Sequence, residues 1–391
     1  MIHNFYGKDF PSGENQVFLL ERHMLESRGH IVDVFIRQSD EIRRQGLWGS
    51  LQAAMSVIWN PWVNRAILRK VEEFKPDIVH VHNTFPLIAN GIFKAIGTKA
   101  RVILSLHNYR IFCPNALLMR NSSVCTECLD KRSVLPSLMH ACYRESLLAT
   151  IPISISVALH QYLRTWSRWI DGYIVSSEFQ KKMLQSARIP SDKIFIKYNS
   201  TKAQIAEIAN KDNVCIFVGR LSKEKGITTL IDAWRIWGKT APLLLIIGDG
   251  PLKAEIEKKT EGLNVKLCGG VSLDVVSKEI SKSKLLIVPS EWFEGFPMII
   301  PTAFAVATPI AVSQLGALDS IVKADKLGVI FPPANPQRLY EVVSTLWRDK
   351  DKLRQLGLNA LKEYEEKYTE DSNYAQLMAI YEQSIKMNPG N

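Results

Sequence analysis

Short aliphatic runs alternate along the chain with longer segments in which apolar residues recur every three or four positions. The short runs, rich in Val, Ile and Leu, are typical of strands buried on both faces of a parallel sheet, and the longer segments are typical of helices. The pattern therefore predicts an α/β protein. Its expected strands lie at residues 31–36, 77–83, 102–106, 214–218, 243–248 and 284–290, with a strand followed by a helix cap at 172–179 and a strand and turn at 265–271.

The composition is that of a globular protein with room for two hydrophobic cores. The chain has 391 residues, of which 46% are hydrophobic and 23% charged, so two domains are expected. Only Met1 and Ile2 precede the polar residues that follow, so we expect residues of a first strand to be missing. No apolar run is long enough to span a bilayer, no signal peptide is evident, and six cysteines without one indicate a cytoplasmic protein.

The net charge of +10 predicts an acidic partner. A membrane surface, a phosphorylated lipid and nucleic acid are the candidates; nucleic acid ranks last, because the basic residues are dispersed and no nucleic-acid module is visible. Segments 43–70 and 147–169 combine Trp and Arg with apolar residues, a composition that suits a membrane interface. Ordinary helices packed on the sheet or between domains are the simpler interpretation of both segments.

The stretch 291–309 holds the most informative local pattern. Glu294 and Gly295 follow the strand at 284–290, and a small, apolar segment at 302–307 predicts a packed helix. Free amides at a helix start favour an anion, a glycine allows close approach, and a glutamate can accept hydrogen bonds from sugar hydroxyls. The alternative is an ordinary strand-to-helix turn with a solvated glutamate.

The wording of this stretch, PSEWFEGFP at 289–297 with ATPIAVSQLGAL at 307–318, resembles the donor-site signature of the retaining nucleotide-sugar glycosyltransferases of family 4. The resemblance extends over nearly the whole chain. It implies the GT-B fold, in which two Rossmann-like, doubly wound domains face a cleft. The corresponding boundaries are an acceptor-binding domain at 1–199, a donor-binding domain at 200–365 and a final helix at 366–391 that crosses back to the first domain.

The resemblance also implies a donor site. In GRLSKEKG at 219–226, Arg220 and Lys225 match the cations that neutralise the donor's phosphates. Such cations can stabilise a departing nucleoside diphosphate without a metal. A glutamate usually stands where this chain has Thr302, and Pro301 before it is expected to bias Ile300 away from helical angles and displace the helix start. The implied donor-binding residues are Gly219, Arg220, Lys225, Gly248, Val271, Glu294, Gly295, Phe296, Met298 and Thr302.

His107 is the best candidate in the N-terminal half, because it follows a predicted strand at the edge where such folds bind ligands. The family places a histidine there near the anomeric carbon, which implies that His107 positions and stabilises rather than acting as a general base; a structural histidine is the alternative. Gly13 and Asn108 are the further cleft residues. The expected catalytic set is His107, Glu294, Arg220 and Lys225.

Four of the cysteines lie close together in the sequence: Cys113, Cys125, Cys128 and Cys142. The two-residue gap between Cys125 and Cys128 is typical of a zinc knuckle, so a structural Zn²⁺ could hold the insertion at 114–136. Reduced, buried cysteines are the alternative. No pair of aspartates follows a strand, so no catalytic metal and no cofactor are expected.

The resemblance implies a retaining, metal-independent glycosyltransferase on the inner face of the plasma membrane. It would use a UDP- or GDP-sugar and a glycan or polyprenyl-diphosphate-linked acceptor, in bacterial surface polysaccharide synthesis such as that of the lipopolysaccharide O-antigen. A catalytically impaired homologue and a nucleotide-sugar epimerase remain alternatives. A glycan phosphorylase would need a pyridoxal phosphate lysine, for which the sequence offers no convincing site.

Overall fold

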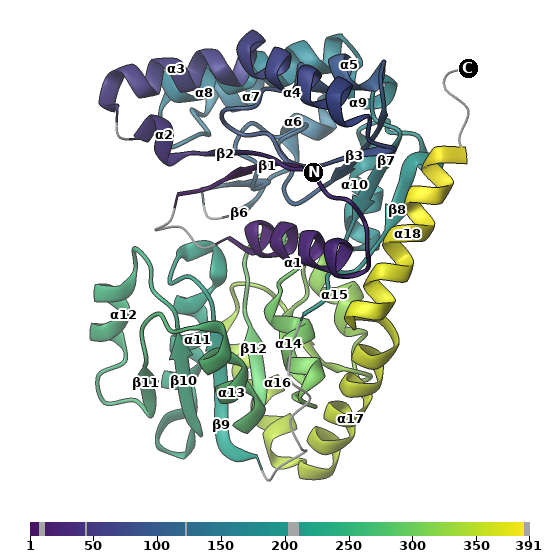
Figure 1. Cartoon of the computed structure of the whole chain (residues 1–391). Coiled ribbons are helices and arrows are strands. Elements are labelled where there is room, and N and C mark those ends of the chain that lie inside the picture. The colour runs from purple at the N-terminus through teal and green to yellow at the C-terminus, as the bar shows by residue number, and fades with distance from the viewer. Residues whose placement is uncertain (8–11, 44, 122, 202–210, 387–391) are drawn as a thin grey trace. The chain divides into compact units, whose positions relative to one another are not determined.

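The computed structural model describes residues 1–7, 12–43, 45–121, 123–201 and 211–386 (Figure 1). The chain forms two compact units. The N-terminal unit contains Met1–Arg120, Cys125–Tyr198 and the chain from Asn373 onward, and the C-terminal unit contains Asn121–Val124 and Asn199–Ser372. Each unit has its own six-stranded sheet with helices packed on it.

The N-terminal sheet is parallel throughout, with the strand order β2-β1-β3-β4-β7-β8. The chain moves outward from β1 to β2 and then returns to the other side of β1 for β3. This reversal creates a switch point between β1 and β3, where the loops after the two strands diverge and leave space for a ligand. The strands are β1 (Ile2–Phe5), β2 (Phe35–Gln38), β3 (Ile78–Asn83), β4 (Arg101–Ser105), β7 (Gly172–Val175) and β8 (Ile194–Ile196).

Strand β1 extends through residues that the sequence pattern placed in a polar loop. Strand β1 includes His3, Asn4 and Phe5 and pairs with β2 along its whole length. Sequence reasoning took these polar residues for a loop, but His3 and Asn4 are buried because their side chains have partners. His3 Nε2 lies 2.8 Å from Oδ1 of Asn15, and Asn4 Nδ2 donates to Oγ of Ser39 at 3.0 Å. A buried polar group that is hydrogen-bonded costs little.

Helices α1 and α18 pack together on the N-terminal sheet. Leu377 and Ile380 of α18 join a core cluster with Met24 and Leu25 of α1 and with residues of β4 and β7. No helix among the described residues is long and apolar enough to cross a membrane. The remaining elements of this part are α1 (Gly13–Ser27), α2 (Asp40–Arg43), α3 (Gly46–Ile58), α4 (Pro61–Phe74), α5 (Ile92–Gly97), β5 (Met119–Arg120), β6 (Ser123–Val124), α6 (Glu127–Asp130), α7 (Leu135–Met139), α8 (Leu147–Tyr162), α9 (Thr165–Arg168), α10 (Glu178–Ser186), η1 (Ser191–Lys193) and α18 (Glu370–Lys386).

The C-terminal sheet has the parallel order β11-β10-β9-β12-β13-β14, with its switch point between β9 and β12. Its core is aliphatic, with Leu285 and Ile287 of β12 fully buried beside Cys215 and Phe217 of β9. The elements are β9 (Asp212–Val218), η2 (Lys223–Lys225), α11 (Ile227–Trp237), η3 (Gly238–Thr240), β10 (Leu243–Ile247), α12 (Lys253–Lys259), β11 (Val265–Leu267), α13 (Leu273–Lys282), β12 (Ser283–Val288), α14 (Ile299–Ala305), β13 (Ile310–Ser313), α15 (Ala317–Val322), β14 (Gly328–Phe331), α16 (Pro336–Arg348) and α17 (Lys350–Lys367).

Helix α14 begins earlier than the sequence indicated. It starts at Ile299, so Ile300 is helical and the expected bias from Pro301 was wrong. Pro301 is the third residue of the helix, and the first four N–H groups of a helix have no intrahelical partner. The missing N–H of proline therefore removes no helical hydrogen bond at this position.

Candidate functional site

The switch point of the C-terminal sheet brings a lysine and a glutamate into contact. Lys225 closes the loop after β9, and Glu294 lies in the loop after β12. The Lys225 ammonium donates to Oε1 of Glu294 at 2.7 Å, and Oγ of Ser290 donates to the same oxygen at 2.6 Å. Glu294 is only 4% exposed. Two of the predicted catalytic residues, 69 positions apart, therefore meet at the edge where doubly wound sheets bind ligands.

A glycine makes this contact between the loops possible. Gly226 has a φ of 66°, and a Cβ atom at this position would lie 1.8 Å from the carbonyl oxygen of Pro289. A side chain here would thus clash with the backbone that leads into Glu294, in a conformation that already favours glycine. The loops are joined by one further backbone bond, from Glu291 N–H to Glu224 O at 2.9 Å.

Gly219 and Gly248, two of the predicted donor-binding residues, lie side by side at the ends of β9 and β10. A Cβ atom on Gly248 would lie 1.9 Å from the carbonyl oxygen of Gly219. The Gly219 N–H donates to Ile247 O at 3.0 Å, and the Gly248 N–H donates to Gly269 O at 2.9 Å. These bonds align the carboxyl ends of β9 and β10, and they fix the start of the loop that carries Arg220.

Arg220 and Lys225 differ in their surroundings. Arg220 is exposed, and its side chain makes no hydrogen bond or ion pair with another residue in the described part of the chain. Lys225 is 25% exposed in its side chain, is paired with Glu294, and holds its ammonium 5.2 Å from the ring centroid of Trp292. In this loop, the Arg220 side chain therefore has no partner among the described residues, whereas the Lys225 side chain is already paired with Glu294.

Thr302 lies in α14, and its hydroxyl is used within that helix. The Oγ1 atom donates to Met298 O at 3.1 Å and lies 3.5 Å from Oγ1 of Thr201. Among the other predicted donor-binding residues, Phe296 packs its ring 5.9 Å from that of Tyr368, Gly295 is half-buried beside Glu294, and Val271 is 37% exposed. All of them belong to the C-terminal unit.

In the N-terminal unit, His107 is the end of a buried chain of polar side chains. Its Nε2 lies 3.1 Å from Nδ1 of His82, and Nε2 of His82 lies 3.5 Å from Oε2 of Glu21. The other Glu21 oxygen accepts a hydrogen bond from Lys197 at 2.7 Å. Burial lowers the pKa of His107 to about 3 and that of His82 well below its usual value. Both rings are therefore neutral at pH 7.

His107 opens onto a pocket at the carboxyl ends of β3 and β4. Its polar lining comes from Asn83 and Thr84 after β3, and from Asn108 and Arg110 after β4. Asn108 Oδ1 accepts from the Arg110 N–H at 3.1 Å, and the Arg110 guanidinium lies 3.7 Å from the Phe85 ring centroid. Predicted residues His107 and Asn108 are thus together, whereas Gly13 is an exposed residue that opens α1.

Sequence reasoning missed Glu14, the residue after Gly13. Burial raises the pKa of Glu14 to about 7, although hydrogen bonds from Tyr6 and Asn108 and the charge of Arg110 oppose that shift. The signal was available, because an acid in the first turn of the helix after β1 must lie near the switch point. Glu21 and His82 were also missed, since nothing in their sequence spacing shows that they meet His107.

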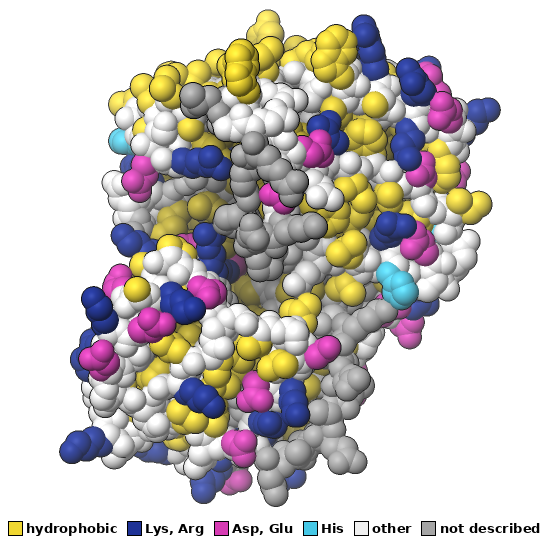
Figure 2. Space-filling model, turned by 60° about the vertical axis from the view of Figure 1, so that its left-hand side comes forward, with side chains coloured by type: hydrophobic (Ala, Val, Ile, Leu, Met, Phe, Trp, Pro, Cys, Tyr) yellow, Lys and Arg dark blue, Asp and Glu magenta, His cyan; other side chains and the backbone are white. Residues whose placement is uncertain are grey.

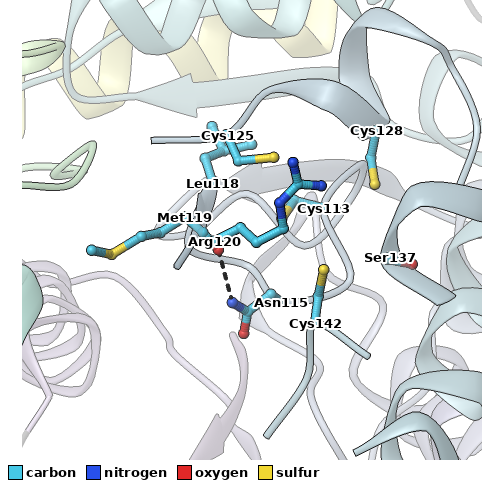
Figure 3. A pocket seen from close by; sticks show the side chains of 9 residues that line it. All are labelled: Cys113, Asn115, Leu118, Met119, Arg120, Cys125, Cys128, Ser137 and Cys142. Carbon is cyan, nitrogen blue, oxygen red and sulfur yellow. Dashed lines mark hydrogen bonds between the residues drawn. The ribbon is translucent and has the colours of Figure 1, made fainter. Parts of the chain in front are cut away.

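One cluster has ligand types that suit a metal, and two of its buried atoms, Glu21 Oε2 and His82 Nε2, have no hydrogen-bond partner among the described residues. Glu21, His80 and His82 place three possible ligand atoms within 4.8 Å of one another. The Lys197 ammonium already neutralises Glu21, and the two nitrogens of His80 lie 2.8 Å from Tyr381 Oη and 2.8 Å from Ser105 Oγ. This cluster fits a structural role. A second candidate set, the four clustered cysteines, lines a separate small pocket (Figure 3).

Two family models match the chain one after the other. The model described as Glycosyltransferase Family 4 matches residues 13–202, and the model described as Glycosyl transferases group 1 matches residues 199–363. Together they extend over every strand of the two sheets except β1 and over every predicted site residue of the two switch points.

Relatives in sequence match over part of their length. An uncharacterized glycosyltransferase of Methanocaldococcus jannaschii is 26% identical over 255 residues, which is 59% of this chain and 65% of the relative. The O-antigen chain mannosyltransferase C of Escherichia coli is 28% identical over 175 residues, 44% of this chain and 46% of the relative. The chain thus spans about half to two thirds of the length of these curated relatives.

Solved structures match over almost the whole chain. HepE of Anabaena, in complex with UDP, superimposes with a TM-score of 0.64 at 15% identity, covering 97% of this chain and 98% of its own. The sucrose-phosphate synthase of Thermosynechococcus elongatus gives 0.69 at 15% identity, covering 97% and 94%. These likenesses, with the two parallel six-stranded sheets, confirm the predicted GT-B fold of two doubly wound domains.

Proposed function

The chain belongs to the family 4 glycosyltransferases, and on that premise we propose that it moves a sugar from a nucleotide-sugar donor to a glycan acceptor. The transfer retains the anomeric configuration and uses no catalytic metal. The observation that carries the proposal is the contact of Lys225 with Glu294 at the C-terminal switch point, with Arg220 exposed in the same loop.

The charges of this site suit a nucleoside diphosphate. An ammonium has three hydrogens, so Lys225 can keep its bond to Glu294 and still donate to a phosphate oxygen. Arg220 has no competing partner among the described residues, and its planar guanidinium can bind phosphate through two parallel hydrogen bonds. As the sugar leaves, negative charge grows on the diphosphate, and two prepositioned cations stabilise it without a metal.

The histidine at the N-terminal switch point serves as a neutral hydrogen-bonding group. With its pKa lowered to about 3, His107 carries no charge at pH 7 and is a weak base. Its Nε2 is held by His82, which fixes the ring so that Nδ1 can meet a sugar or acceptor hydroxyl. The role is therefore positioning of the substrate, and the departing phosphate is the base that accepts the acceptor's proton.

A UDP- or GDP-sugar is the proposed donor, and a lipid-linked glycan of a bacterial surface polysaccharide is the proposed acceptor. HepE, which shares the fold, has been solved with UDP and with UDP-glucose. The Escherichia coli relative is named for mannosyl transfer in O-antigen synthesis. Both names support the donor and acceptor classes proposed here.

A lipid-linked acceptor calls for a membrane-facing surface, and the N-terminal unit has a suitable one. Helices α3 and α8 pack together, contain no Asp, Glu, Lys or Arg, and expose large apolar side chains. Trp48 is 77% exposed and Leu148 is 83% exposed. Hydrophobic side chains line the upper edge of the view in Figure 2, the same edge at which α3 and α8 lie in Figure 1. This apolar face consists of Trp48, Leu51, Met55, Leu147, Leu148, Ile151 and Ile155.

We assign the apolar face to the surface of an anionic bilayer, because the chain carries a net charge of +10 and an exposed Trp suits the headgroup region. Vesicles containing anionic lipid should carry the wild-type protein upward in a flotation gradient. The double variant Trp48→Ser/Leu148→Ser should remain in the soluble fraction while binding UDP as before. Equal flotation of the two proteins, or no flotation of the wild type, would remove the assignment.

Calorimetry tests the donor site directly. Wild-type protein is titrated with UDP, GDP and their common sugar conjugates, and Arg220→Ala is titrated beside it. One nucleotide should bind at micromolar concentration and bind at least tenfold more weakly to the variant, since a hydrogen bond to a charged group contributes about 1.5–3 kcal/mol. Binding of no nucleotide, or equal binding to both proteins, would refute the donor site.

Thr302 favours a second candidate, a homologue that binds nucleotide sugars without turnover. The family's usual glutamate is replaced by a residue whose hydroxyl is engaged with Met298 O. Incubation with the donor that binds best and a lipid-linked acceptor extract separates the two. Release of nucleoside diphosphate that depends on the acceptor supports transfer, and tight binding with no release supports the second candidate.

A further inference from the structure

The chain makes a long excursion between β4 and α8 that contains little regular structure. Among the described residues from 106 to 146, the longest element is the five-residue helix α7. Most of its buried apolar side chains, such as Tyr109, Phe112 and Leu118, lie before residue 119. Small scaffolds with little regular structure are often held by a disulfide or a metal. All six cysteines of the chain are free thiols, so no disulfide holds it.

The four cysteines of this excursion surround one small pocket. Cys113, Cys125, Cys128 and Cys142 all line it, together with Arg120 and Ser137. Figure 3 shows the side chains approaching from different segments, with the sulfurs of Cys128 and Cys142 directed into the same space. Cys113 comes from the loop after β4, Cys125 from the turn into α6, Cys128 from α6 itself and Cys142 from the turn after α7.

Backbone amide groups around two of the cysteines donate hydrogen bonds that favour the thiolate form of the sulfur. Amide groups of Leu118, Asn115 and Ala116 hydrogen-bond to the sulfur of Cys113, and the amide of Ser137 does the same for Cys128. Ala116 and Leu118 adopt φ angles of 67° and 50°, which are unfavourable for side-chain-bearing residues and must be held by their surroundings. Amides aimed at sulfur are worthwhile chiefly if the sulfur carries negative charge.

A single pocket lined by four thiols suits a divalent cation, because a coordinating thiol loses its proton to solvent when the metal binds. Arg120 also lines the pocket, where its guanidinium donates to Oε2 of Glu127 at 2.6 Å.

We propose that Cys113, Cys125, Cys128 and Cys142 bind one structural Zn²⁺ that holds the excursion in place. Four thiolates with a two-residue gap in one pair are the ligand set of tetrahedral structural zinc sites. No three of the four sulfurs lie within 4.8 Å of one another in the described chain, so binding the ion requires these side chains to move closer together. The site lies far in sequence from Arg220 and Lys225 and is independent of the donor proposal.

Metal analysis of the full-length protein tests the site. Protein purified without added zinc should contain about one zinc per chain by mass spectrometry. The variants Cys125→Ser and Cys142→Ser should lose it, and the matched control Cys268→Ser, in the C-terminal unit, should keep it. Cobalt-substituted protein should show the visible absorption of a tetrahedral tetrathiolate site. Iron in place of zinc, zinc retained by both serine variants, or zinc bound only in excess would overturn the proposal.

Misfolding of the serine variants is controlled by removing the metal from the wild type. Chelator-treated wild-type protein should become sensitive to proteolysis within 113–142, and restored zinc should reverse the sensitivity. UDP binding measured in the same samples reports on the C-terminal unit separately. A metal-free wild type that is folded, equally protease-resistant and carries four freely titrating thiols would refute the inference.

Discussion

Arg220 and Lys225 should contribute alike to nucleotide binding but very differently to stability. Both cations lie in the loop after β9. Arg220 is exposed and has no polar partner among the described residues, so Arg220→Ala removes only interactions with the ligand. Lys225→Ala also removes the donor at 2.7 Å from Glu294, a carboxylate that is only 4% exposed. The two substitutions therefore separate ligand binding from structural support.

The size of the stability difference follows from the burial of the pair. Removing one partner of a fully buried ion pair costs about 3–5 kcal/mol. The Lys225 side chain is 25% exposed and Ser290 still donates to Glu294, so we expect a smaller loss of about 2 kcal/mol for Lys225→Ala. For a unit of 150–250 residues this corresponds to a Tm lower by about 4–8 °C. Arg220→Ala should remain within about 0.5 kcal/mol of wild type.

Two measurements on the same samples test this reasoning. Calorimetry with UDP should show weaker binding by about 10- to 150-fold for each single variant, because each loses a charged hydrogen bond of about 1.5–3 kcal/mol. Scanning calorimetry should show a lower Tm for Lys225→Ala only. The double variant Lys225→Ala/Glu294→Gln should regain part of the stability, because a neutral amide tolerates the site better, and should not regain binding.

Two results would refute the argument. If Lys225→Ala unfolds at the same temperature as Arg220→Ala, the pair with Glu294 contributes nothing to the fold. If neither variant weakens UDP binding, the C-terminal switch point does not hold the diphosphate, whatever the stability results show.

Three further predictions concern single positions. Gly226→Ala should lower the Tm and weaken UDP binding, because its Cβ would lie 1.8 Å from a carbonyl oxygen. Gly262→Ala, at a φ of 75° with nothing within 4 Å, should cost only about 1 kcal/mol, and equal losses would contradict the steric argument. The pKa of His107 is about 3 in the folded chain against 6.5 ordinarily, so the folded state binds fewer protons between these values and stability is lost as pH falls from 6.5 towards 3. His107→Asn should therefore show a shallower loss in thermal unfolding across this range, and an unchanged slope would contradict the shift. Thr302→Val should change UDP affinity less than about fivefold, or about 1 kcal/mol, because its hydroxyl already bonds to Met298 O; a larger loss by calorimetry would show that the hydroxyl reaches the ligand.

The fold could be predicted wherever a strand is aliphatic throughout. The runs at 214–218 and 284–290 coincide within two residues with β9 and β12. The failures are strands whose hydrophobic pattern is interrupted. Strand β1 buries His3 and Asn4 because partners from other segments satisfy them. The run at 31–36 was placed too early, since Ile31 is 87% exposed and the pairing begins at Phe35.

In the candidate site, too, one aspect could be predicted from the sequence and another could not. Loops after strands can be located from sequence, so Arg220, Lys225 and Glu294 could be assigned to one edge of one sheet before their contact was known. The environment of a side chain depends on residues far away in the chain. His107 owes its neutral state to burial and its orientation to His82, 25 positions earlier. Glu14 owes its raised pKa to burial, which outweighs the opposing hydrogen bonds from Tyr6 and Asn108.

The two switch points differ in charge, and the difference bears on the proposed mechanism. At the C-terminal switch point, the cations Arg220 and Lys225 lie in the loop beside one buried carboxylate, Glu294, which Lys225 contacts. At the N-terminal one, His107 and His82 are neutral at pH 7, and Glu14 titrates only at about pH 7. A side chain with a pKa of about 3 is too weak a base to activate an acceptor hydroxyl at neutral pH, and efficient general bases lie near the working pH. Of the described groups at this switch point whose pKa is shifted, Glu14 alone has a pKa near the working pH, so Glu14→Gln decides between two routes. If acceptor-dependent turnover persists in Glu14→Gln, the proton passes to the departing phosphate held by Arg220 and Lys225; if turnover is lost while UDP binding is kept, Glu14 is the base.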